Sequence, residues 1–298
     1  MKKHILNSVI VICLSFFVVF IAIGSVQSKP YTYKLDGVYS ISPDGILSLI
    51  SEDAEIVIKG SDRTDVHIVV RKEYNISGLF VAHENEPFEM DIEEDDGNII
   101  MREVGGIFNT VGIMTIMREE YEISIDIPTG VSLKLRGEDD NYLIENVNGN
   151  ISLRIEDGRA RLKQCNGEQF NIEIEDGNVE MDSGSGMLDV FIEDGKLTVE
   201  NGKFSDIDAS CEDGTLDIET SLSSEGVYRL NAEDGRIYFN VTSGGGEFQV
   251  RMDDGHVRAS SKFELLEEDD DNALYRLPGG SAKIRARVED GSIRIHAD

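Results

Sequence analysis

The chain has 298 residues, with 28 basic and 58 acidic side chains and a formal net charge of −30 at pH 7. A body this acidic repels nucleic acid and anionic lipid headgroups, so we expect no nucleic-acid partner. Apolar residues still make up 40% of the sequence and recur with a strict period. The chain is therefore expected to fold and not to stay a disordered acidic polymer.

Residues 1–28 have the pattern of a signal peptide. A basic start with Lys2 and Lys3 precedes an apolar run from Val9 to Gly24 that contains no charge. Small residues near its end predict cleavage after Ser28. The alternative is an uncleaved anchor, the only membrane contact we expect, although the run is shorter than the roughly 20 residues that span a bilayer. In both cases the body is exported, to the periplasm, the cell surface or the exterior.

Residues 29–148 form a strand-rich N-terminal part without a regular period. Short apolar stretches typical of strands lie at residues 46–50, 54–58, 66–70 and 121–125. An apolar, glycine-rich insertion at 78–118 interrupts them. We expect it to form a buried hairpin or a cap over one end of the fold, with an exposed patch for a partner or a lipid surface as the alternative.

Residues 149–298 carry a regular repeat. An acidic pair followed by glycine recurs, mostly at steps of 18–21 residues, at 156–158, 175–177, 193–195, 212–214, 233–235, 253–255 and 289–291. The last gap is nearly two periods long, and Asp270-Asp271-Asn272 within it is interpreted as a degenerate eighth copy.

Apolar residues alternate with polar ones on both sides of each repeat glycine. They stand three, five and seven positions before it and two and four positions after it. Alternation with a period of two predicts two short strands per repeat, each with one buried face. Asp-Gly supplies the turn between them, because glycine accepts positive φ and aspartate can hydrogen-bond its own backbone.

Two all-β architectures fit this repeat. The favoured one is a single-stranded parallel β-solenoid of about eight coils, in which each coil stacks on the one before. In the alternative, Asp-Gly is a hairpin turn and the chain forms an antiparallel β-meander or sandwich. A meander of about fifteen strands would have to curl or split to bury its face, which favours the solenoid.

Two cysteines, Cys165 and Cys211, remain after the predicted cleavage. An exported pair often forms a disulfide. Here the two residues stand at unlike positions of different repeats, so we expect two free, buried thiols.

The sequence resembles the bacterial DUF4097 family, which is described as "putative adhesin". The resemblance rests on the strand pair from Leu49 to Ile58, the segment Ser61–Val70, and the segment Ile125–Val131 that opens into the Asp-Gly repeats. It covers about residues 40–298. It implies a β-helical fold and an adhesin-like role at the envelope or the cell surface.

Stacked coils would bring the repeat aspartates into one row at a spacing of about 4.8 Å. Closely spaced carboxylates repel one another and suit Ca²⁺, so the row is a candidate Ca²⁺ ladder. The alternative is that each aspartate only caps its turn. No other cofactor is expected, and the candidate ligands are Asp157, Asp176, Asp194, Asp213, Asp234, Asp254 and Asp290.

The sequence lacks familiar catalytic motifs. It contains no His-Glu-x-x-His, no Gly-x-Ser-x-Gly and no phosphate loop. The acidic residues recur at identical repeat positions, which fits turns better than one catalytic centre. We therefore expect an exported, non-enzymatic binding or scaffold protein whose partner is an envelope protein or a glycan. The alternatives are a β-helical polysaccharide-active enzyme and an envelope-stress or assembly component.

Overall fold

A computed structural model describes residues 27–79, 83–105, 107–109 and 113–298. The signal-peptide prediction therefore falls almost wholly outside the described residues. Within the described residues the fold is all-β, as predicted, and no helix is long and apolar enough to cross a membrane. The strands are β1 (Gln27–Ser40), β2 (Ile46–Ser51), β3 (Glu55–Ser61), β4 (Asp65–Leu79), β5 (His83–Glu86), β6 (Glu89–Asp95), β7 (Asn98–Val104), β8 (Ile107–Asn109), β9 (Ile113–Pro128), β10 (Ser132–Glu145), β11 (Ile151–Lys163), β12 (Gln169–Asp182), β13 (Ser185–Ser221), β14 (Val227–Ser243), β15 (Gly246–Ala259), β16 (Glu264–Glu268), β17 (Asn272–Leu277) and β18 (Ala282–Ala297).

The chain divides into two compact units. The smaller unit comprises residues 1–34, 71–89 and 104–121. Its described part contains a small aromatic core in which the Phe88 ring packs edge-on against Tyr33 at 5.1 Å and Tyr121 at 5.4 Å. The Lys72 ammonium lies 4.5 Å and 4.2 Å from the Phe88 and Tyr121 ring centroids, which adds a cation–π contact.

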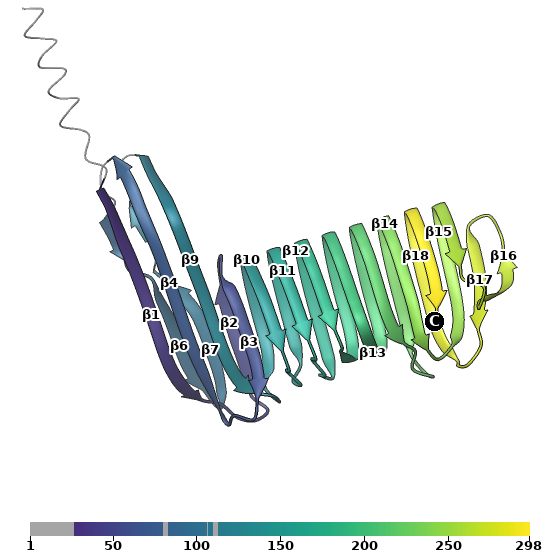
Figure 1. Ribbon diagram of the computed structural model, residues 1–298, viewed down its shortest axis with the longest axis horizontal. Helices are drawn as coiled ribbons and strands as arrows, with labels where there is room; N and C mark the ends of the chain where they lie inside the picture. The colour runs from purple at the N-terminus through teal and green to yellow at the C-terminus, as the bar shows by residue number, and fades with distance from the viewer. Residues whose placement is uncertain (1–26, 80–82, 106, 110–112) are drawn as a thin grey trace, which may run out of the picture. The chain divides into compact units, whose positions relative to one another are not determined.

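The larger unit comprises residues 35–70, 90–103 and 122–298 and contains the repeats as stacked coils (Figure 1). Strand β11 pairs with β12 in parallel on both sides of the Asp-Gly, with Gly158 opposite Gly177. Each Asp-Gly therefore lies at a corner where one strand changes direction, with a first arm before it and a second arm after it. An antiparallel meander would require a hairpin there, so that alternative is wrong for these coils.

Apolar side chains of both arms fill the interior of the stack. The alternating positions identified in the sequence are buried in coil after coil, and the largest include Phe170, Tyr228, Phe239 and Phe248. Burying such a side chain contributes about 1.5–3 kcal/mol. The coil of Gly255 differs, because Met252 and Val257 are only half-buried there. Strand β17 pairs only with the first arm of β15, and no strand among the described residues pairs with the second arm on that side.

The coils do not all stack in chain order. Strand β18, the last in the sequence, pairs with β14 on one side and with β15 on the other, both in parallel. Asp290 consequently lies between Asp234 and Asp254. The expectation that each coil stacks on the one before is therefore wrong for the coil of β15, because β18 lies between it and β14.

The predicted eighth copy at Asp270-Asp271-Asn272 is also wrong. Asp270 and Asp271 lie in the turn of an antiparallel hairpin formed by β16 and β17. The Asp269 carboxylate holds this turn by accepting hydrogen bonds from the Asp271 and Asn272 backbone amides. Strand β17 pairs antiparallel with β15 and so protects an edge that would otherwise be open. The sheet is therefore mixed, and a purely parallel solenoid is not confirmed.

The coil register extends upstream of residue 149. Strand β10 pairs in parallel with β11, and its two arms pair with β2 and β3. In the 78–118 insertion, β6 pairs with β7 across Asp96-Gly97, where φ is +45° and +79°. The described part of the insertion thus contains a hairpin, but β6 is mostly exposed, and the apolar, glycine-rich segment that follows lies largely outside the described side chains. In contrast to the coil corners, this Asp-Gly does form a hairpin turn.

The two cysteines agree with the prediction. Cys165 and Cys211 are both buried and free, with exposed fractions of 1% and 3%. They lie in different coils at different positions, so the fold does not bring them together as a pair.

Candidate functional site

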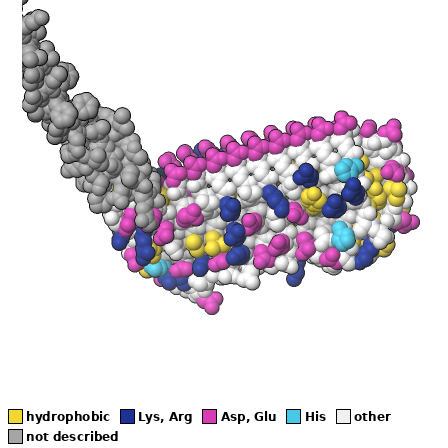
Figure 2. Space-filling model, turned by 45° about the horizontal axis from the view of Figure 1, so that its top comes forward, with side chains coloured by type: hydrophobic (Ala, Val, Ile, Leu, Met, Phe, Trp, Pro, Cys, Tyr) yellow, Lys and Arg dark blue, Asp and Glu magenta, His cyan; other side chains and the backbone are white. Residues whose placement is uncertain are grey.

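The coil corners form an acidic ridge, defined as the acidic pairs that precede each corner glycine. Parallel pairing places the seven predicted aspartates in one row, in the order Asp157, Asp176, Asp194, Asp213, Asp234, Asp290 and Asp254. Asp139 extends the row at its N-terminal end. Figure 2 shows the ridge as a continuous line of acidic side chains along the top of the view.

Close packing of the backbone explains why glycine follows the acidic pair. A Cβ atom added to Gly195 would lie 1.8 Å from the Gly177 carbonyl oxygen, and one on Gly177 would lie 2.0 Å from that of Gly158. The φ angles of Gly195 and Gly177 are +144° and +156°, which other residues rarely adopt. The corner glycines therefore set how closely the acidic side chains approach one another.

Neighbouring carboxylates raise the pKa of Asp157 in the ridge and of Glu138 at its N-terminal end. Burial and the neighbouring Asp176 and Asp139 carboxylates raise the pKa of Asp157. The pKa of Glu138 is raised chiefly by Glu52 on the adjacent coil. Among the described residues no group of three or more acidic, histidine or cysteine side chains is arranged to hold a metal ion. The aspartate row exists, and Ca²⁺ binding by it stays a prediction.

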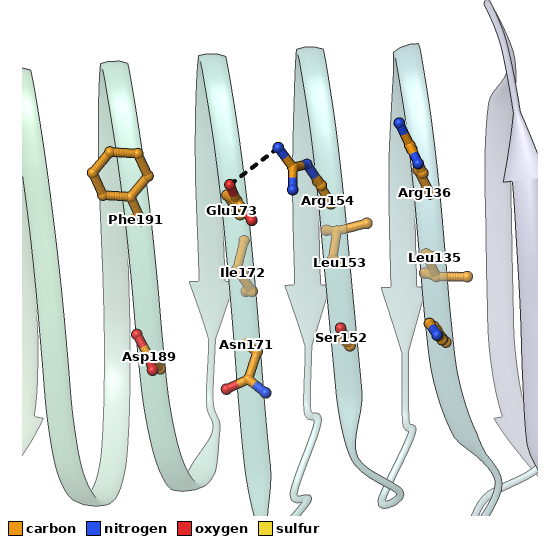
Figure 3. A pocket seen from close by; sticks show the side chains of 11 residues that line it. Leu135, Arg136, Ser152, Leu153, Arg154, Asn171, Ile172, Glu173, Asp189 and Phe191 are labelled. Atoms are coloured by element: carbon orange, nitrogen blue, oxygen red, sulfur yellow. Dashed lines mark ion pairs between the residues drawn. The ribbon is translucent and has the colours of Figure 1, made fainter.

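A second surface, here called the face groove, lies on the first arms of β10, β11, β12 and β13. It is an open depression of about 530 Å³ (Figure 3). Buried Leu135, Leu153 and Ile172 alternate with the outward side chains that line it. Those outward side chains are Lys134, Arg136, Ser152, Arg154, Asn171, Glu173, Asp189 and Phe191.

Charge is distributed unevenly along the face groove. Lys134 and Arg136 lie at its β10 end and form no ion pair with any other described residue. Arg154 pairs with Glu173 at 3.4 Å, as the dashed line in Figure 3 marks. At the β13 end, burial raises the pKa of Asp189, with a smaller contribution from the Asp208 carboxylate. The groove thus has a cationic end and an end with an aromatic ring and a carboxylate.

This arrangement suits an extended ligand with negative charge. Guanidinium and ammonium groups bind carboxylates and phosphates, and the amide and hydroxyl of Asn171 and Ser152 can hydrogen-bond neutral groups. The half-buried Phe191 ring offers an apolar face. Because the lining residues come from four successive coils, a chain-like ligand could contact several coils at once.

Sequence reasoning missed the face groove. It followed the inward positions, which repeat, and treated the outward ones as a solvated face. A signal was present four residues before each corner glycine. At this position the outward residues are Arg136, four residues before the corner residue Asp140, and then Arg154, Glu173 and Phe191 in the next three coils. A phenylalanine at an outward position departs from the pattern.

Comparison with known proteins gives one family. The family model described as Toastrack DUF4097 matches residues 46–296. No curated protein matches the chain.

Several solved structures align with this chain over most of their length. A "putative adhesin" from Parabacteroides distasonis is 10% identical with a TM-score of 0.44, covering 90% of this chain and 97% of its own. A "putative adhesin" from Bacteroides fragilis is 14% identical with a TM-score of 0.40, covering 91% and 97%. A "putative lipid binding protein" from Parabacteroides distasonis is 13% identical with a TM-score of 0.32, covering 91% and 97%. These likenesses are too loose to carry a conclusion about function.

Proposed function

The chain belongs to the Toastrack DUF4097 family, and from that premise we propose that it is an exported, non-enzymatic binding protein of adhesin-like type. It acts in the envelope or at the cell surface, and its ligand is an acidic glycan of the envelope that binds in the face groove. The apolar N-terminal run after Lys2 and Lys3 supports export.

The observation that carries this proposal is the cationic end of the face groove in a protein with a net charge of −30. Lys134 and Arg136 stand side by side with Ser152 and Arg154 across the β10–β11 ladder, since the register pairs Lys134 with Ser152 and Arg136 with Arg154. Three exposed cations within two neighbouring coils form a local anion-binding surface.

An acidic glycan fits the rest of the groove better than a small ligand does. The depression is open and lacks the walls that would enclose a compact molecule. It crosses four strands, so an extended ligand can follow it. The Phe191 ring can pack against the apolar face of a sugar ring, while Ser152 and Asn171 can hydrogen-bond its hydroxyl groups. The parallel pairing of the strands holds these side chains at fixed positions relative to one another.

The full chain is expressed in cells and the protein is recovered from them. The experiment measures how tightly this protein binds acidic polysaccharide purified from the envelope of the same cells. We expect saturable binding that weakens with added salt, because the contacts are ionic. The variant K134Q/R136Q/F191A removes the unpaired cations and the ring, and should reduce affinity about tenfold or more. A matched control, R229Q/R251Q, removes two exposed arginines outside the groove and should bind as the wild type does.

Two outcomes would contradict the proposal. Equal binding by the groove variant and the wild type would remove the face groove as the ligand site. Cleavage of the bound polysaccharide, seen as new chain ends, would show that the protein is an enzyme.

A further inference from the structure

The second arms of the last coils carry another group of basic residues, here called the terminal basic patch. It comprises Arg236 and Tyr238 on β14, Arg294 and His296 on β18, and His256 and Arg258 on β15. All are exposed except Tyr238, which is half-buried. Figure 2 shows blue and cyan side chains of this kind gathered below the acidic ridge at the right of the view.

The out-of-order position of β18 creates this patch. The parallel register places Arg294 between Tyr238 on one side and Arg258 on the other. Had the coils stacked in chain order, Arg258 would lie next to Tyr238. Like charges at directly opposed positions destabilise a sheet, so the Arg294–Arg258 neighbours carry an unfavourable interaction that an anion would relieve.

The patch arginines lack ion-pair partners among the described residues. Arg236, Arg258 and Arg294 form no ion pair with any other residue in the described part of the chain. Two carboxylates on the second arm of the preceding coil are engaged elsewhere: Asp217 pairs with Lys196 at 3.0 Å, and Glu219 accepts a hydrogen bond from Asn240 at 3.0 Å. Asp298 contacts Lys262 through its backbone oxygen and lies 3.7 Å from His296.

Tyr238 fixes one of the arginines. The Arg294 guanidinium carbon lies 5.3 Å from the centre of the Tyr238 ring, within the range of a cation–π contact. A guanidinium stacked on a ring keeps its N–H edges free to bind oxygen atoms. Arg294 is therefore held in place at the middle of the patch.

We propose that the terminal basic patch is a second anion-binding site, which takes a linear polymer bearing closely spaced carboxylate or phosphate groups. The three guanidinium groups come from three adjacent coils, which repeat at about 4.8 Å, so successive anionic groups of one polymer can each meet a different arginine. This site lies on the second arms, away from the face groove, and does not depend on the function proposed for that groove.

The test measures the affinity of the full chain for two anionic polymers, polygalacturonate and inorganic polyphosphate, with dextran as the neutral control. The variant R236Q/R258Q/R294Q removes the three unpaired cations. The matched control R229Q/R251Q/R287Q removes three arginines from the first arms of the same coils, where each one already pairs with an aspartate. Both variants change the net charge equally.

We expect the wild type to bind at least one anionic polymer and not dextran. The patch variant should lose about tenfold or more in affinity, and the control about twofold or less. Comparing polygalacturonate with polyphosphate identifies the anionic group. Equal loss in both variants, or no binding of either polymer by the wild type, would overturn the proposal. Binding to vesicles that contain phosphatidylglycerol, with no binding to the polymers, would overturn it in favour of a lipid headgroup.

Discussion

Asp140 lies opposite Gly158 in the parallel register of β10 and β11, so a fully buried aspartate occupies a corner position that glycine fills in the following coils. Its carboxylate accepts hydrogen bonds from the Ser51 hydroxyl at 2.6 Å, the Ala54 amide at 2.6 Å and the Tyr142 hydroxyl at 3.2 Å. Burial raises the pKa of Asp140, and these hydrogen bonds oppose that rise. Asp140 thus ties the coil of β10 to the corner between β2 and β3.

Replacing Asp140 should test this tie. Asp140→Ala leaves the Ser51 hydroxyl and the Ala54 amide without their acceptor in a buried place, and should lower the free energy of unfolding by about 2–4 kcal/mol. Asp140→Asn keeps one acceptor oxygen and should cost less. The measurement is chemical denaturation of each variant, with exposed Asp139→Ala as the control, expected within about 0.5 kcal/mol of the wild type. A stability of Asp140→Ala equal to that of the control would show that the hydrogen bonds contribute nothing.

The corner glycines should resist substitution for steric reasons. In Gly195→Ala the new Cβ would meet the Gly177 carbonyl oxygen at 1.8 Å, and since that atom belongs to paired backbone it cannot move aside easily. We expect a loss of about 2 kcal/mol or more. In Gly202→Ala the nearest atom is at 3.0 Å, so this variant serves as a milder control. Similar melting temperatures for the two variants would contradict the close packing of the corners.

The acidic ridge should make stability depend on pH in an unusual direction. The pKa values of Glu138 and Asp157 are raised in the folded state, so the folded chain binds these protons more tightly than the unfolded chain does. Their contribution to stability is complete below the ordinary carboxyl pKa and is lost as pH rises through the raised pKa values. The melting temperature should therefore rise as pH falls from 7 toward the ordinary glutamate pKa of 4.5.

Two other carboxylates, those of Glu180 and Asp253, limit this pH effect. At lower pH, Glu180 and Asp253 act in the opposite sense, because arginine hydrogen bonds lower their pKa values and that stabilisation disappears on protonation. The variant E138Q/D157N removes the two raised groups, and its melting temperature should change less between pH 7 and the carboxyl range. A wild-type melting temperature that falls throughout this acidification would contradict the predicted sign.

Calcium binding by the ridge remains to be tested directly. If Ca²⁺ bridges the aspartate row, adding it should raise the melting temperature, because a ligand that binds only the folded state stabilises it. The variant D176N/D194N/D213N interrupts the row and should abolish the shift. Its control is D62N/D65N/D126N, which removes the same charge away from the ridge. A wild-type melting curve unchanged by Ca²⁺ would show that the aspartates act only at their corners.

The two thiols offer a check on the register of the coils. Burial raises the pKa of Cys165, and burial together with the Asp213 carboxylate raises the pKa of Cys211 to about 11. Both thiols should therefore react slowly with a disulfide reagent at pH 8 in the folded protein and rapidly after unfolding. If both thiols reacted with the reagent as fast in the native protein as in the unfolded protein, these residues would lie at the surface.

Much of the fold follows from the repeat, because period-two alternation on both sides of Asp-Gly specifies which side chains point inward. The position of β18 could not be predicted, since its inward residues have the same apolar pattern as those of every other coil, and that pattern does not specify which coils are its neighbours. The coil of β10 was missed because Asp140 stands where the repeat has glycine. The face groove was missed because outward residues follow no repeat, and only Phe191 stands out among them.

The most direct test of the central claim is the binding of the full chain to acidic envelope polysaccharide, compared between the wild type and K134Q/R136Q/F191A. We predict saturable, salt-sensitive binding by the wild type and a loss of about tenfold or more in the variant, with the fold of both unchanged. Equal affinities of the two proteins, or no binding by the wild type, would contradict a role for the face groove in ligand binding.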